Sequence, residues 1–279
     1  MNSLTYPTLQ SAQNYNIVAP ISVFFSIIAV IISILILVLI SLTKQLHTVT
    51  RLLTCNICLA SILYCIVQCN NYTYLLFVRW EKSDQSCRWR GYFGYLAMIA
   101  CVYSYILQVL SRFFFIVLST KYRWLTSLKI HSYSIVIGWI IILVLPLPAI
   151  LTNDIYFREG FLCWIPKKAI LHTIYITIAY FSIPMILIFG IYTFINVRIH
   201  SSGNHAAMIS RRRRKIRDLE IFRNITISFS IYFLGRVPYI LFLVTNFEFF
   251  YTMGVISVTF AVTAEILMFS FHLYSFIVR

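Results

Sequence analysis

Apolar residues in this chain come in long runs rather than in short alternating patterns. The runs cover residues 17–42, 52–78, 87–118, 132–151, 169–197, 219–245 and 250–278, with short polar segments between them. A helix needs about 20 mostly apolar residues to cross the hydrocarbon core of a bilayer. The pattern therefore predicts an all-α membrane protein, a bundle of seven transmembrane helices over residues 17–279 that follows a short polar N-terminal segment, residues 1–16.

Composition agrees with a membrane protein. Of 279 residues, 60% are hydrophobic and only 11% are charged, whereas soluble domains carry about 25% charged residues. A net charge of +15 would suggest nucleic acid in a soluble protein. Here the basic residues border apolar runs, so we expect no nucleic acid and predict contacts with anionic lipid at Arg211, Arg212, Arg213, Arg214 and Lys215.

Basic residues are distributed unevenly between the two sets of connecting segments. The segments on one side, with the C-terminal residue, hold thirteen Lys and Arg, and those on the other side hold seven. Cytoplasmic loops carry an excess of Lys and Arg. The asymmetry predicts a multi-pass plasma-membrane protein with its N-terminus outside and its C-terminus in the cytoplasm.

The third run contains one charged residue near its far end, Arg112, and opens with Cys87. Twenty-five residues of helix between them span roughly 37 Å, close to the thickness of a bilayer. The cysteine and the arginine are therefore expected at opposite membrane faces. A charge in such a run is costly, and two interpretations stay open: an arginine that extends to the headgroups, or a switch cation buried in the bundle.

Cys87 and the triplet Ser111-Arg112-Phe113 resemble the two ends of the third helix in rhodopsin-like (class A) G-protein-coupled receptors. In that family a cysteine opens the helix and Asp-Arg-Tyr closes it, so Ser111 replaces the acid. Further matches occur in the expected runs and in the expected order: Asn56 to Ser61 on the second, Trp139 on the fourth, Pro184 with Tyr192 on the fifth, Pro238 on the sixth and Tyr274 on the seventh.

The resemblance implies a receptor that binds an extracellular ligand and signals to a heterotrimeric G protein by outward movement of the sixth span. Its activation residues would be Ser111, Arg112, Phe113, Tyr192, Asp218 and Tyr274. We expect Arg112 to pair with Asp218 in the closed state and with Tyr192 in the open state. Because the acid at Ser111 is missing, raised basal activity is predicted. Asp218 could instead pair locally with Arg214 or Lys215.

The resemblance also restricts the ligand. Gly94 stands where the family's amine receptors carry an Asp, and Ala264 stands where visual pigments carry the lysine that binds retinal. We therefore expect neither ligand, and predict a peptide or a small acidic ligand. Residues placed in the pocket by position are Asn71, Tyr95, Met98, Arg236, Tyr239 and Phe260. Arg236 could be a ligand counter-ion, or could pair with Glu265 within the membrane.

Other functions remain as alternatives. The departures at Ser61, Ser111, Arg236 and Phe271 leave open a receptor relative that does not couple to a G protein. A small-solute transporter or channel could use Arg236 and Glu265 as a gate, although no internal repeat supports it. Glu265 is the one acid expected inside the membrane, and His172 and His272 lack partners at metal-ligand spacing. We therefore predict no enzyme, metal site or cofactor.

Seven cysteines occur, and five of them lie inside apolar runs. Cys87 and Cys163 are the two that lie clearly outside, both on the side predicted to be oxidising. A disulfide between them is the natural pairing, and two free thiols are the alternative. Such a bond would hold the loop between the fourth and fifth spans over the bundle.

Overall fold

The computed structural model describes residues 9–42, 48–77, 83–119, 122–157, 162–165 and 169–201, together with positions 227, 230, 234 and 263. Within these ranges the regular structure is helical. Five stretches are long and apolar enough to cross a membrane: Ala19–Leu42, Val49–Phe77, Asp84–Leu118, Leu128–Leu151 and Ile170–Ile195. They overlap the first five predicted spans. Residues 219–245 and 250–278 lie outside the described residues apart from those four positions, each of which is helical.

The helical elements follow one another along the chain as a series of long rods, several of which change their winding. They are α1 Leu9–Leu42, α2 Val49–Phe77, α3 Asp84–Phe113, the π-helix η1 Phe114–Leu118, the 3-10 helix η2 Arg123–Thr126, α4 Leu128–Val144, α5 Leu147–Leu151, α6 Ile170–Ile176, the π-helix η3 Thr177–Ser182 and α7 Ile183–Ser201. The helix α1 begins at Leu9, before the predicted start at residue 17, although its apolar span begins at Ala19.

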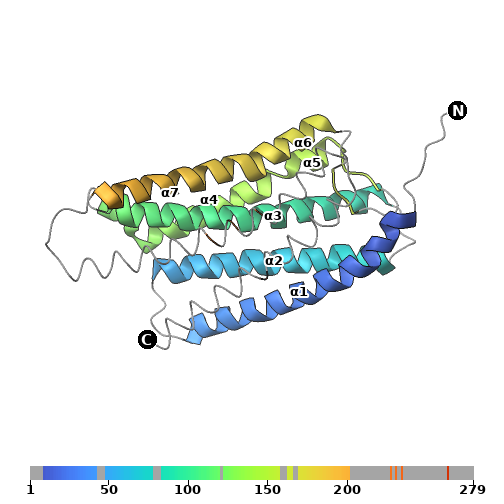
Figure 1. Cartoon of the computed structure of the whole chain (residues 1–279), viewed down its shortest axis with the longest axis horizontal. Helices are drawn as coiled ribbons and strands as arrows, with labels where there is room; N and C mark the ends of the chain where they lie inside the picture. The colour runs from blue at the N-terminus through green and yellow to red at the C-terminus, as the bar shows by residue number, and fades with distance from the viewer. Residues whose placement is uncertain are drawn as a thin grey trace.

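The helix α3 occupies the middle of the described bundle. In Figure 1 it runs between α2 on one side and α7 on the other, with α1 beyond α2. The helix begins at Asp84, where the side chain of Ser83 accepts the N–H of Ser86 as an N-cap. An acid in the first turn and a polar cap both stabilise a helix start. This start places Arg88 and Arg90 inside α3.

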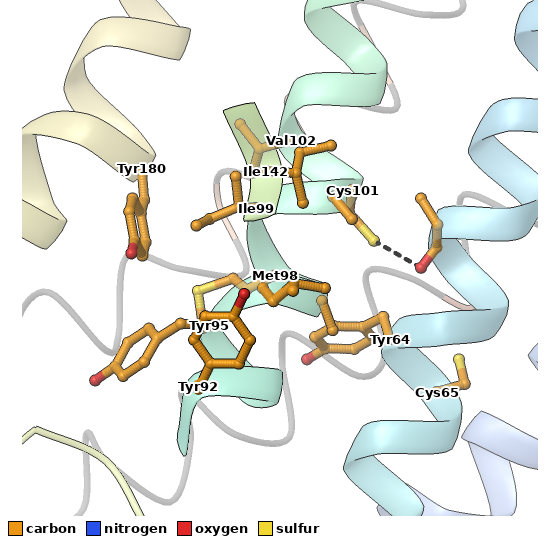
Figure 2. Close-up of a cluster of buried hydrophobic side chains, with 14 of the residues drawn as sticks. Tyr64, Cys65, Tyr92, Tyr95, Met98, Ile99, Cys101, Val102, Ile142 and Tyr180 are labelled. Carbon is orange, nitrogen blue, oxygen red and sulfur yellow. Dashed lines mark hydrogen bonds between the residues drawn. The ribbon is translucent and has the colours of Figure 1, made fainter. Parts of the chain in front are cut away.

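Aromatic residues fill the core around α3. Tyr64, Tyr95 and Tyr180 are each at most 2% exposed and come from three different elements. Figure 2 shows Met98 and Tyr95 of α3 at the centre of this cluster, with Tyr180 on one side and Tyr64 on the other. The thiol of Cys101 donates to the carbonyl of Ala60 at 3.6 Å, which joins α3 to α2.

A buried polar contact joins three spans. The side-chain amide of Asn56 donates to Oγ of Ser104 at 2.9 Å, and Nε1 of Trp139 donates to Oδ1 of Asn56 at 2.9 Å. Asn56 lies on α2, Ser104 on α3 and Trp139 on α4. Both Asn56 and Trp139 are part of the family resemblance, and here they bond to each other.

Two prolines divide the fourth span. Pro146 and Pro148 have no N–H to donate, and α4 ends at Val144 before α5 starts at Leu147. The carbonyl of Leu145 accepts the hydroxyl of Tyr175 at 2.9 Å and that of Tyr180 at 3.4 Å. The fifth span therefore supplies donors at the break in the fourth.

One contact involves a position near the end of the chain. Thr263 is buried, and its hydroxyl donates to the carbonyl of Phe25 on α1 at 3.5 Å. This contact brings residue 263, in the predicted seventh span, next to the first span.

Candidate functional site

Arg112 is buried at one end of the bundle, which we call the arginine end. Its side chain is 5% exposed, and its Nη2 donates to Oγ1 of Thr50 on α2 at 3.1 Å. Ser111 beside it is 2% exposed. The arginine therefore lies within the bundle and does not extend to the surface. It has the polar partner that a buried cation requires.

Two other predicted activation residues lie on or next to the packed cluster at the same end. Phe113 packs its ring 5.9 Å from that of Phe194. Tyr192 on α7 is half-buried and packs against the cluster that contains Val109 and Ile188. Asp218 and Tyr274 lie outside the described residues, so the pairing of Arg112 with Asp218 stays a prediction.

His131 on α4 packs against the π-helix η1, which follows Arg112 in the chain. It is 3% exposed, and its ring stacks on Phe115 with centroids 5.8 Å apart. Its Nδ1 hydrogen-bonds with the carbonyl of Ser127 at 2.9 Å. Sequence reasoning missed this residue, although a histidine at the border of an apolar run is a signal of a buried polar contact.

The opposite end carries the predicted disulfide, and we call it the disulfide end. Cys87 and Cys163 are bonded, with their Cα atoms 5.2 Å apart, which confirms that pairing. Two further bonds fix the chain after α5 to the start of α3. The N–H of Phe157 donates to Oδ1 of Asp84 at 2.8 Å, and Nε of Arg88 donates to the carbonyl of Ile155 at 3.3 Å.

The residues after Cys163 enter the bundle. The N–H of Ile165 donates to the hydroxyl of Tyr95 at 3.0 Å. The indole of Trp164 meets the same tyrosine edge-on, with ring centroids 4.9 Å apart. A Cβ added at Gly94 would lie 3.6 Å from Cη2 of Trp164 and 3.6 Å from Nδ2 of Asn71. Trp164 thus occupies the space next to the position where the family's amine receptors carry an acid. Sequence reasoning missed it, since a lone Trp in a loop has no pattern.

A second polar cluster lies beside this loop. Oγ1 of Thr152 donates to Oδ2 of Asp154 at 2.7 Å, and Nδ1 of His172 forms a short hydrogen bond with the same oxygen. The hydrogen bond from Thr152, followed by that from His172, lowers the pKa of the Asp154 carboxyl. The bond between Asp154 and His172 links the loop to α6. Among the described residues no group of three His, Cys, Asp or Glu could hold a metal.

Of the predicted pocket residues, three are described and all three are buried. Tyr95 and Met98 belong to the central cluster, and Asn71 lies 9% exposed on α2. Arg236, Tyr239, Phe260 and Glu265 lie outside the described residues, as do the basic residues 211–215.

The comparisons with known proteins agree with this geometry. A sequence model of the family described as "7 transmembrane receptor (rhodopsin family)" matches residues 32–275. The chain belongs to the rhodopsin family of seven-transmembrane receptors. It is therefore a multi-pass membrane receptor by family and not an enzyme, as the sequence predicted.

Muscarinic acetylcholine receptors are among the relatives of this receptor chain. It is 23% identical over 225 residues to muscarinic acetylcholine receptor M4 of Gallus gallus, a match that covers 78% of this chain and 46% of the relative. It is 28% identical over 129 residues to muscarinic acetylcholine receptor M3 of Rattus norvegicus, a match that covers 46% of this chain and 22% of the relative. The chain thus spans less than half the length of these relatives.

Proposed function

We propose that this protein is a plasma-membrane receptor that binds an extracellular ligand at the disulfide end and activates a heterotrimeric G protein at the arginine end. The observation that carries the proposal is the position of Arg112. It is the charged residue in the last turn of α3, it is 5% exposed, and it lies at the opposite end of that helix from the Cys87–Cys163 bond. Family membership supplies the rest.

The coupling step rests on the cost of a buried cation. A charge inside a bundle needs charged or polar partners, and removing one of them is strongly destabilising. Thr50 is neutral, so an acid is the natural further partner, and Asp218 at the start of the sixth span has the right sign and predicted depth. Separation of Arg112 from Asp218, with Tyr192 as the new partner, lets the sixth span move outward. The groove that opens accepts a helix of the G protein.

The orientation follows from two features. The disulfide end faces the oxidising exterior, and the basic run at residues 211–215 faces anionic lipid on the cytoplasmic side. The N-terminus is then outside and the C-terminus inside.

The ligand differs from a small amine. The relatives are named for acetylcholine, yet this chain has Gly94 in place of the amine-binding acid, with the indole of Trp164 packed beside it. A peptide or small acidic ligand suits a pocket of Asn71, Tyr95, Met98, Arg236, Tyr239 and Phe260, where Arg236 supplies a cation.

Ligand-free nucleotide exchange on G proteins in membranes tests the coupling. The unmodified chain should stimulate nucleotide exchange, and so should Lys129→Glu, an exposed charge reversal at the start of α4. Arg112→Glu should not. If the unmodified chain and Lys129→Glu reach the cell surface and neither stimulates exchange, the prediction of raised basal activity is wrong. A screen of peptides and organic acids in the same assay then separates a silent receptor from a non-coupling relative, and solute uptake into vesicles tests the transporter alternative.

A further inference from the structure

A cavity of about 400 Å³ lies between α2 and α3 towards the disulfide end. It is lined by residues of these two helices, from Ile66 to Asn71 on α2 and from Ser86 to Phe93 on α3. Its size is within the range of about 300–1,000 Å³ that small-molecule sites have.

The cavity has an exposed apolar rim. Ile66, Trp89 and Phe93 are 55%, 50% and 45% exposed. In a bundle with apolar spans this surface faces lipid, because the bilayer solvates large apolar side chains that water would not. The cavity therefore opens sideways towards acyl chains, and Trp89 has the amphipathic ring that membrane interfaces favour.

The lining of the cavity is mostly apolar and includes one cation, Arg90. The guanidinium of Arg90 on α3 lies over the ring of Tyr74 on α2, and this cation–π contact links the two helices. Asn70, Asn71 and Ser86 add amide and hydroxyl groups to the same lining.

The depth of Arg90 suits a headgroup. It lies six residues after the first residue of α3, about 9 Å along the helix axis. This depth corresponds to the headgroup boundary, where a charge is far less costly than at the bilayer centre. A mostly apolar cavity with one cation at that boundary matches a molecule that has an anionic head and an apolar chain.

This cavity differs from the proposed ligand pocket. Asn71 lines the cavity, and its amide is also 3.6 Å from where a Cβ on Gly94 would lie, next to Trp164. Asn71 thus forms part of the wall between the interior of the bundle and the lipid-facing groove.

We propose that the groove between α2 and α3 binds a single-chain membrane amphiphile with a carboxylate or phosphate head. The head contacts Arg90 with the amide of Asn70, and the chain leaves the cavity along Ile66 and Phe93. The site is independent of G-protein coupling and of the ligand at the disulfide end, so either can fail without the other.

Photolabelling of the full chain in lipid nanodiscs tests the site. The probe is hexadecanoic acid with a diazirine on its chain, and its methyl ester is the uncharged analogue. Labelled peptides are mapped by mass spectrometry in the unmodified chain, in Arg90→Gln, which removes the charge, and in Ile66→Trp, which fills the cavity. Arg88→Gln is the matched control, because Arg88 is an arginine of the same turn region that does not line the cavity. Size-exclusion profiles and the intact disulfide verify folding of each variant.

We expect the label on residues 66–93 of the unmodified chain. Labelling should fall about tenfold in Arg90→Gln, because a charge-assisted hydrogen-bond partner is lost, and should fall likewise in Ile66→Trp. It should be unchanged in Arg88→Gln. Undiminished labelling of folded Arg90→Gln and Ile66→Trp would overturn the proposal. Equal labelling by the methyl ester would indicate an unselective lipid surface and would also overturn it. Complete competition by inorganic phosphate at millimolar concentration would indicate a site for a free anion and not for a membrane amphiphile.

Discussion

The indole of Trp164 lies against Gly94, and the contact leaves room for a methyl group and little more. A Cβ there would lie 3.6 Å from Cη2 and 3.8 Å from Cζ3 of the indole, which is ordinary van der Waals contact. A side chain at position 94 that is much longer than that of cysteine would have to displace the tryptophan. The loop after α5 therefore contributes an inner wall to the bundle, and the residue at position 94 sets how deeply it enters.

Removal of this indole should expose position 94 to solvent. In Gly94→Cys the new thiol lies beneath Trp164, so we expect slow labelling by a water-soluble maleimide. Combining it with Trp164→Ala should accelerate labelling several-fold, because the covering ring is gone. The parent chain supplies the background from its five free cysteines. Trp124→Ala, an exposed tryptophan of η2, is the control, and equal labelling rates in the two backgrounds would contradict the packing described.

A side chain at Gly91 should disrupt the disulfide end. A Cβ at this position would lie 2.5 Å from the carbonyl oxygen of Cys163 and 2.7 Å from Cδ1 of Ile155. The first of these atoms belongs to the backbone, so the loop must move. We expect Gly91→Ala to cost about 1–3 kcal/mol, as overpacking does, and to lower the melting temperature. Gly190→Ala is the matched control, since no atom lies within 4 Å of its added Cβ, and similar losses in both variants would refute the steric explanation.

Loss of the Asn56 amide should loosen the contact between the second, third and fourth spans. Asn56→Ala leaves Nε1 of Trp139 and the hydroxyl of Ser104 without the partners they have here. We expect a loss of about 1–2 kcal/mol in the free energy of unfolding. Thermal unfolding in detergent measures it against Thr54→Ala, whose hydroxyl bonds within its own helix to Thr50. No difference between the two variants would show that the three-span contact contributes nothing.

The Asp154 cluster should make stability depend on pH in the acid range. Its pKa is lowered by the hydrogen bonds from Thr152 and His172, so the folded state favours the carboxylate. This contribution is complete above the unfolded pKa of about 3.9 and is lost as the pH falls through the lowered folded pKa. Melting temperatures of the unmodified chain should exceed those of Asp154→Asn at pH 7, by a small amount because the side chain is 33% exposed.

The same comparison at falling pH completes the test. The difference between the two chains should shrink below about pH 4. Thr152→Val should reproduce part of the loss at neutral pH, since its hydrogen bond is the largest cause of the shift. A difference that stays constant down to acid pH would contradict the assignment.

The sequence was sufficient for the features that depend on long runs or on residue type. Apolar runs predicted the five described spans, because crossing a bilayer fixes length and composition together. The pairing of Cys87 with Cys163 followed from their place outside the apolar runs. Arg112 was identified as a buried switch cation or a surface arginine, and its burial, with Thr50 as a hydrogen-bond partner, favours the first.

Other features depend on contacts that no run or spacing encodes. The insertion of Trp164 beside Gly94 requires the loop to turn inward after Cys163, which the pattern of the loop does not show. The π-helices at Phe114–Leu118 and Thr177–Ser182 lie within long apolar runs whose pattern does not indicate a change of winding. His172 had no partner at helical spacing, since Asp154 approaches it from the preceding loop. The first of these bears on function, because it alters the pocket that the resemblance implied.

Ligand-free nucleotide exchange tests the central claim, that this chain is a working receptor with Arg112 as its switch. Three chains are compared at equal surface expression: the unmodified chain, Arg112→Glu and Asp218→Ala. The account predicts measurable exchange by the unmodified chain, none by Arg112→Glu, and more by Asp218→Ala, because loss of the acid frees the arginine. Exchange that Arg112→Glu leaves unchanged, or no exchange by any of the three, would contradict it.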